Sequence, residues 1–129
     1  ANGTDYNRVN LLMAVLEKRA GMRLANSDAY VNIAGGIKVN EPALDLGIVM
    51  AIASSFRNRP IDDKLVCFGE VGLSGEVRAV SQAAQRVSEA QRLGFKTVVM
   101  PALSVDTVKG NSGMKIIGVK SVADVLEIF

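Results

Sequence analysis

The chain has 129 residues, of which 49% are hydrophobic and 22% are charged. This composition indicates one globular domain with a sizeable core and excludes a disordered chain. Its net charge of +2 permits a nucleic-acid partner without requiring one. The sequence contains no histidine, which excludes Ser-His and Cys-His catalysis and the usual zinc sites, so we expect no metal or other cofactor in this domain.

The single cysteine, Cys67, excludes an internal disulfide and lies in an apolar run, which favours a buried structural thiol. No apolar run is long enough to span a bilayer, and the first residues are not a signal peptide. We therefore expect a cytoplasmic protein without a membrane partner. The chain begins without methionine, so we expect residues 1–129 to be one domain of a longer protein.

The first predicted element is a helix over residues 5–19, with Thr4 as its N-cap. Apolar residues at helical spacing give it one broad buried face. The basic residues of this helix are expected to face water: Arg8, Lys18 and Arg19.

A half-buried strand is predicted over residues 29–34, followed by the bulge Gly35-Gly36. The central helix is predicted over residues 41–59, with Pro42 in its first turn. Almost every side chain over residues 44–53 is apolar, so this helix should be buried on all sides. Asp45 is the exception, and a buried carboxylate there must find hydrogen bonds or a cation.

The second half alternates short strands and helices. We predict an inner strand over residues 65–68, a hairpin turning at Ser74-Gly75, and a helix capped by Ser81 and closed by Gly94. Strands over residues 97–100 and 115–119 follow, separated by a polar loop over 105–113, and then a last helix capped by Ser121 with Asp124. The hairpin makes the sheet mixed, so the fold class is α+β, with helices packed on a mixed sheet.

Two chemical interpretations of these motifs are rejected. The glycines near the hairpin do not end in Gly-Lys-Ser or Gly-Lys-Thr and do not lead into a helix, so they indicate turns rather than a phosphate loop. Glu41 and Asp45 share a helix face, and answering the helix dipole or a nearby cation is favoured over acid–base catalysis.

The order of these motifs resembles the proteolytic domain of Lon proteases over nearly the whole chain. The resemblance implies the Lon proteolytic-domain fold, which is similar to ribosomal protein S5 domain 2, and the chain would then lack its N-terminal strands. In active members the motif GPSAG carries the nucleophilic serine and GGLKEK carries the lysine base. Here residues 41–45 read Glu-Pro-Ala-Leu-Asp and residues 81–86 read Ser-Gln-Ala-Ala-Gln-Arg, so Ala43 and Ala84 occupy the dyad positions.

A shift in alignment does not restore the dyad. The nearest later serine, Ser54, lies 11 residues further along the helix, roughly 16 Å away, and no lysine occurs between Lys64 and Lys96. A serine nucleophile needs its base within about 3 Å. We therefore expect no peptidase activity.

Longer motifs resemble the C-terminal domain of the RadA (Sms) family of bacterial DNA-repair ATPases. They are Ala34-Gly35-Gly36-Ile37-Lys38, Arg57-Asn58-Arg59-Pro60 and the run from Phe68 to Arg78. The resemblance implies a hexameric, DNA-binding scaffold in a DNA-dependent ATPase that drives branch migration during recombination. It also implies ATP, magnesium and zinc in the parent protein and a RecA-type recombinase as a partner.

A further motif, Thr4-Asp5-Tyr6-Asn7-Arg8, also resembles that family. The first candidates for binding DNA phosphates are basic residues inside the RadA-like motifs: Arg8, Lys38 and Arg78. Second-rank candidates are Arg57, Arg59, Arg86 and Arg92. Aromatic residues are only 5%, so contact with the DNA backbone is favoured over base stacking. Two alternatives stay open: a residual hydrolase that uses Ser54 or Ser81, and an oligomerisation module without DNA contact.

Overall fold

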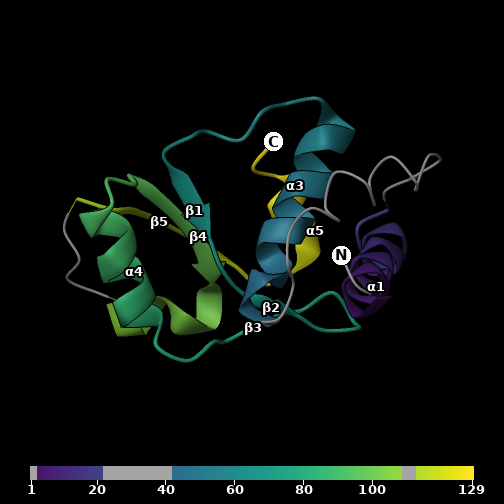
Figure 1. Ribbon diagram of the computed structural model, residues 1–129, viewed down its shortest axis with the longest axis horizontal. Helices are drawn as coiled ribbons and strands as arrows, with labels where there is room; N and C mark the ends of the chain where they lie inside the picture. Colours follow the sequence, from purple (N-terminus) through teal and green to yellow (C-terminus); the bar gives the residue numbers. More distant parts are fainter. Residues whose placement is uncertain (1–2, 22–41, 109–112) are drawn as a thin grey trace.

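The central layer of the fold is a parallel three-stranded sheet in the order β1-β4-β5 (Figure 1). The computed structural model describes residues 3–21, 42–108 and 113–129. Leu65 pairs with Thr97, and Thr97 pairs with Lys115, so the three strands begin at the same end of the sheet. The strands are β1 (Leu65–Cys67), β4 (Thr97–Pro101) and β5 (Lys115–Val119).

A short antiparallel hairpin formed by β2 (Glu70–Val71) and β3 (Val77–Arg78) lies beside this sheet. The predicted α+β class, with helices packed on strands of mixed direction, is confirmed. Two details of the prediction are wrong for the part of the chain that the structure describes. The hairpin forms a separate two-stranded sheet, and β1 lies at the edge of the parallel sheet whereas β4 is the inner strand.

Helices cover both faces of the parallel sheet. Helix α4 (Ala83–Arg92) and the 3-10 helix η2 (Ala102–Val108) pack on one face. Helices α3 (Asp45–Arg57) and α5 (Val122–Leu126) pack on the other face, and α1 (Gly3–Arg19) lies outside α3 (Figure 1). Successive strand residues point to opposite faces, so Val98 joins the cluster under α4 while Val99 joins the cluster under α3.

Helix α3 is the predicted central helix, and its burial is confirmed because seven of its thirteen residues are buried. It is preceded by a 3-10 turn, η1 (Pro42–Leu44), so the α-helix begins at Asp45. It ends at Asn58, whose φ of 53° is left-handed and whose backbone N–H bonds the carbonyls of Ser54 and Ser55. The strand predicted over 29–34 and the Gly35-Gly36 bulge lie outside the described residues.

Three predicted helix caps differ from the structure. Thr4 lies inside α1, which already includes Gly3. Helix α4 begins at Ala83, so the N-cap position belongs to Gln82 rather than to Ser81. Ser121 does occupy the N-cap position of α5, but its side chain makes no capping bond; instead the Asp124 carboxylate accepts the N–H of Lys120 at 2.9 Å.

Candidate functional site

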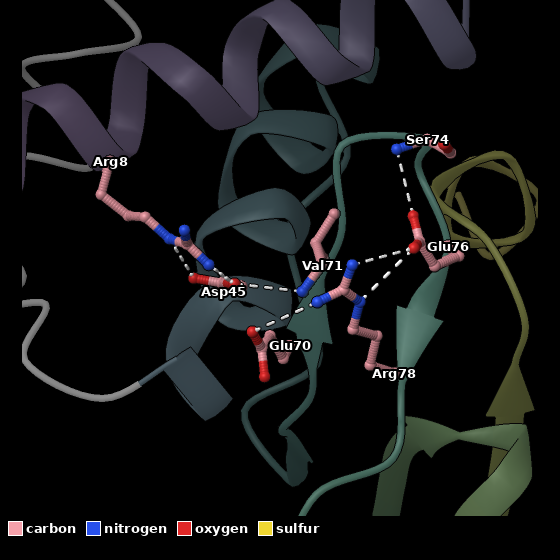
Figure 2. Close-up of polar contacts among 7 residues, drawn as sticks. All are labelled: Arg8, Asp45, Glu70, Val71, Ser74, Glu76 and Arg78. Carbon is pink, nitrogen blue, oxygen red and sulfur yellow. Dashed lines mark hydrogen bonds and ion pairs between the residues drawn. The ribbon is translucent and has the colours of Figure 1, made fainter.

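A buried ion pair joins the first helix to the central helix (Figure 2). Asp45 is fully buried, and its Oδ1 accepts a hydrogen bond from Nε of Arg8 at 2.8 Å. Arg8 Nη2 also bonds Oδ2, which in addition accepts the backbone N–H of Val71 at 3.0 Å. Two-pronged pairing of this kind supplies charge-assisted bonds to a carboxylate that water cannot reach. The pair therefore connects α1, α3 and β2.

This contact corrects the expectation that Arg8 faces water. Its side chain is 27% exposed and points toward Asp45. The hydrogen bond to Asp45 raises the pKa of Arg8 and outweighs the opposing effect of burial, so the guanidinium stays charged. The interpretation that Asp45 answers a nearby cation is confirmed.

Arg78 lies between two carboxylates on the neighbouring hairpin (Figure 2). Its guanidinium is 3.2 Å from Oε2 of Glu76 and 3.9 Å from Oε1 of Glu70. Oε1 of Glu76 accepts the N–H of Ser74 at 3.1 Å, which braces the turn. The pKa of Glu76 is lowered by its own backbone N–H, by Arg78 and by Ser74. Much of the positive charge of Arg78 is thus offset within the hairpin.

The two alanines at the dyad positions have different surroundings. Ala43 is buried in η1, and its carbonyl accepts the N–H of Gly69 at 2.8 Å. Ala84 is exposed on α4 and lines a shallow hollow with Ser88 and Arg92. The cleft between η1, β1 and α4 has a volume of about 580 Å³ and is lined by Leu44 rather than by Ala43. Its described lining holds no serine or lysine, so it offers no Ser-Lys pair.

The serines considered for a residual hydrolase are also poorly placed. The hydroxyl of Ser54 donates a hydrogen bond to the carbonyl of Arg59 and so holds the chain in place just after α3. Ser81 is exposed ahead of α4, and its carbonyl accepts Nε of Arg86 at 3.2 Å. The Ser54 hydroxyl is thus bonded to a carbonyl rather than to a base, and the contact of Ser81 within the described residues is made by its backbone.

Cys67 lines the same cleft, and burial raises the pKa of its thiol to about 12. Because the thiolate is the reactive form, we expect iodoacetamide to label Cys67 very slowly at pH 8 in the folded protein and readily after unfolding in urea. Mass spectrometry of the peptide that contains Cys67 measures this directly. Equal labelling rates in the two states would contradict the prediction of a buried structural thiol.

The remaining basic candidates occupy three positions. Arg57 and Arg59 are exposed at the end of α3. Arg86 lies over the ring of Phe68, with its guanidinium carbon 5.7 Å from the ring centroid, and Arg92 pairs with Glu89. Lys38 lies outside the described residues.

Sequence reasoning did not single out three further exposed lysines at the starts of the parallel strands. Lys64 and Lys96 immediately precede β1 and β4, and Lys115 begins β5. The signal was present, because these three predicted strands each begin at a lysine or just after one, but the strand order was needed to align them.

The described residues offer neither a metal site nor a membrane span. Among them, no group of three or more His, Cys, Asp or Glu side chains could hold a metal ion. Within the same ranges, no helix is both long enough and apolar enough to cross a membrane.

A comparison with known protein families shows the class of protein to which the chain belongs. The family described as subunit ChlI of Mg-chelatase matches residues 7–104, which is most of the chain and includes α3, the hairpin and α4. The chain therefore belongs to this family, as an α+β domain with a buried central helix.

Within that class, the chain is similar along almost its whole length to proteins named DNA repair protein RadA. It is 55% identical over 128 residues to the protein of Halalkalibacterium halodurans and 55% identical over 126 residues to that of Bacillus subtilis. It is 44% identical over 127 residues to the protein of Listeria monocytogenes. The predicted RadA resemblance is confirmed, and the chain spans 28% of the length of each of these relatives.

Proposed function

We propose that this chain is a non-proteolytic scaffold domain of a RadA-like DNA repair protein. In this role it helps to assemble a hexameric ring and binds the DNA backbone, while the intact cytoplasmic protein uses ATP, with magnesium and a structural zinc, to drive branch migration beside a RecA-type recombinase. The observation that carries the proposal is the identity of 55% over 128 residues to a DNA repair protein RadA.

Loss of peptidase chemistry fits the same proposal. Ala43 and Ala84 replace both members of the dyad, and the Ser54 hydroxyl is bonded to a carbonyl. A serine peptidase needs a nucleophile and a base in contact. The domain acts instead through its surface.

For DNA contact, the geometry favours two of the second-rank arginines over two of the first-rank ones. Arg8 and Arg78 have their charges offset by carboxylates, whereas Arg57 and Arg59 are exposed at the end of α3. Lys38 stays a candidate on its motif alone. Arginines of this kind hold DNA through phosphates, without reading sequence.

For ring assembly, three leucines supply apolar surface on different parts of the domain. Their exposed fractions are 68% for Leu73, 61% for Leu93 and 77% for Leu103. A ring needs two different complementary patches on each subunit, and exposed apolar side chains favour such contacts.

The test is DNA affinity of the intact protein carrying Arg57→Gln and Arg59→Gln. We expect its affinity for duplex DNA at 50 mM salt to fall roughly tenfold and its salt dependence to become shallower, because each lost phosphate contact removes about 0.9 from the slope of log K against log[salt]. Fluorescence anisotropy with a labelled duplex measures both quantities.

The matched control is Lys18→Gln with Arg19→Gln, which removes the same charge from exposed positions in the last turn of α1. If this pair weakens binding as much as the α3 pair does, the effect is one of net charge and the arginines are not a site. Sedimentation of both variants reports separately on the ring.

A further inference from the structure

Three lysines lie side by side at the end of the sheet where the parallel strands begin: Lys64, Lys96 and Lys115. The backbone N–H of Lys96 donates to the carbonyl of Lys64 at 2.8 Å, and the N–H of Lys115 donates to the carbonyl of Lys96 at 2.9 Å. Neighbouring strands are about 4.8 Å apart, and all three lysines lie at the end of the sheet where the strands begin. Lys64 and Lys96 precede the paired residues Leu65 and Thr97 and so share one face of the sheet, whereas Lys115 pairs with Thr97 and points to the other face.

The charges of this row are not neutralised within the described residues. All three lysines are exposed, and among those residues none of their ammonium groups forms an ion pair. Lys64 and Lys96 lie opposite each other on adjacent strands, so their like charges repel, and a polyanion would relieve this repulsion. Two carboxylates are nearby: Asp62, which accepts the backbone N–H of Lys64 at 2.8 Å, and the exposed Asp63.

The end of α3 lies at the same end of the molecule. Residues 58–64 connect the last turn of α3 to the start of β1, and Figure 1 shows this connection running along the upper side, where β1 begins. We call the resulting surface the basic rim: Arg57, Arg59, Lys64, Lys96 and Lys115. Its five positive charges outnumber Asp62 and Asp63 by three, whereas the whole chain has a net charge of +2. The five basic residues and these two carboxylates together carry a net charge of +3, one more than the whole chain.

We propose that the basic rim binds the phosphate backbone of DNA, with Lys64, Lys96 and Lys115 as its centre. This inference rests on the proposed DNA-binding function and gives it a location. Phosphates line each strand of the duplex at one per about 3.4 Å of helix axis, so lysines on both faces of the sheet at this end can each meet a phosphate. Long lysine side chains adjust to the duplex as point charges, which suits contact that does not read sequence.

The test compares two triple variants of the intact protein. The rim variant carries Lys64→Gln, Lys96→Gln and Lys115→Gln. The control carries Lys18→Gln, Arg19→Gln and Lys120→Gln, which removes the same charge at the opposite end of the sheet: Lys120 follows the last residue of β5, and Arg19 lies against Gly75 of the hairpin turn. The probe is a fluorescent duplex of random sequence, titrated from 50 to 200 mM salt.

We expect the rim variant to bind at least tenfold more weakly at 50 mM salt, with a slope of log K against log[salt] shallower by roughly 2 to 3, since three phosphate contacts are lost. The control should bind within about threefold of the wild type, and both variants should unfold at the same temperature because all the altered side chains are exposed.

Three results would overturn the rim. If rim and control variants bind alike, the lysines are ordinary surface charges. If the lysine variant binds normally while Arg57→Gln with Arg59→Gln weakens binding, DNA binding by the domain stands and the lysine row is not its centre. If every variant binds as the wild type does, the proposed DNA contact of this domain fails as well.

Discussion

Replacing Arg8 with alanine should lower the free energy of unfolding by about 3–5 kcal/mol, because it leaves the carboxylate of Asp45 buried without its cation. Asp45 is fully buried, and once Arg8 is removed the N–H of Val71 is the hydrogen-bond donor that remains to it among the described residues. Urea unfolding followed by circular dichroism measures the loss. The matched control is Lys18→Ala on the same helix. Because the Lys18 side chain is exposed, its removal should lower the free energy of unfolding by no more than about 0.5 kcal/mol.

A double variant separates the cost of an unpaired charge from the net value of the pair. Arg8→Met with Asp45→Leu removes both charges, and replacing a buried pair by apolar side chains is often close to neutral. We therefore expect it to be more stable than Arg8→Ala. If Arg8→Ala is as stable as Lys18→Ala, the pair does not hold α1 in place. If in addition that variant binds DNA weakly, Arg8 has the phosphate-binding role that its motif predicts.

Apolar patterning predicted most of the secondary structure because burial decides it. Residues 44–53 are apolar except for Asp45, and most of them lie in the buried part of α3. The strand predicted over 115–119 is observed with the same bounds. Helix starts were predicted less well, because hydroxyl residues are common before helices that they do not cap, as Thr4 and Ser81 illustrate.

The sequence could not predict the parts of the candidate site that depend on contacts between residues far apart in the chain. The need of Asp45 for a partner follows from its apolar neighbours, but Arg8 is 37 residues away, and no local spacing identifies it. The alanines at positions 43 and 84 were readable from the sequence once the motifs were aligned, but their different surroundings were not. The lysine row was not, because Lys64, Lys96 and Lys115 become neighbours only through the order β1-β4-β5.

Gly75→Ala should destabilise the fold about as much as Arg8→Ala does. We expect it to lower the free energy of unfolding by roughly 2–5 kcal/mol, from two separate causes. Gly75 has a φ of +82°, a conformation that alanine adopts only with strain. An added Cβ would also lie 2.8 Å from Cβ of Arg19 and 3.2 Å from Cγ2 of Val122, so the hairpin turn could no longer pack on α1 and α5. Urea unfolding gives the total loss.

Alanine variants of two other glycines separate the effect of backbone strain from the effect of crowding. Gly94 has a φ of +96°, and an added Cβ would meet no described atom within 4 Å, so Gly94→Ala tests backbone strain alone, at about 1–3 kcal/mol. Gly118 lacks a positive φ, but its added Cβ would lie 2.9 Å from Cγ2 of Val105, so Gly118→Ala tests crowding alone, also at about 1–3 kcal/mol. If Gly75→Ala costs no more than Gly94→Ala, the turn does not press on α1. In that case the hairpin is held mainly by hydrogen bonds, from the N–H of Val71 to Asp45 and from the N–H of Val77 to the carbonyl of Lys120.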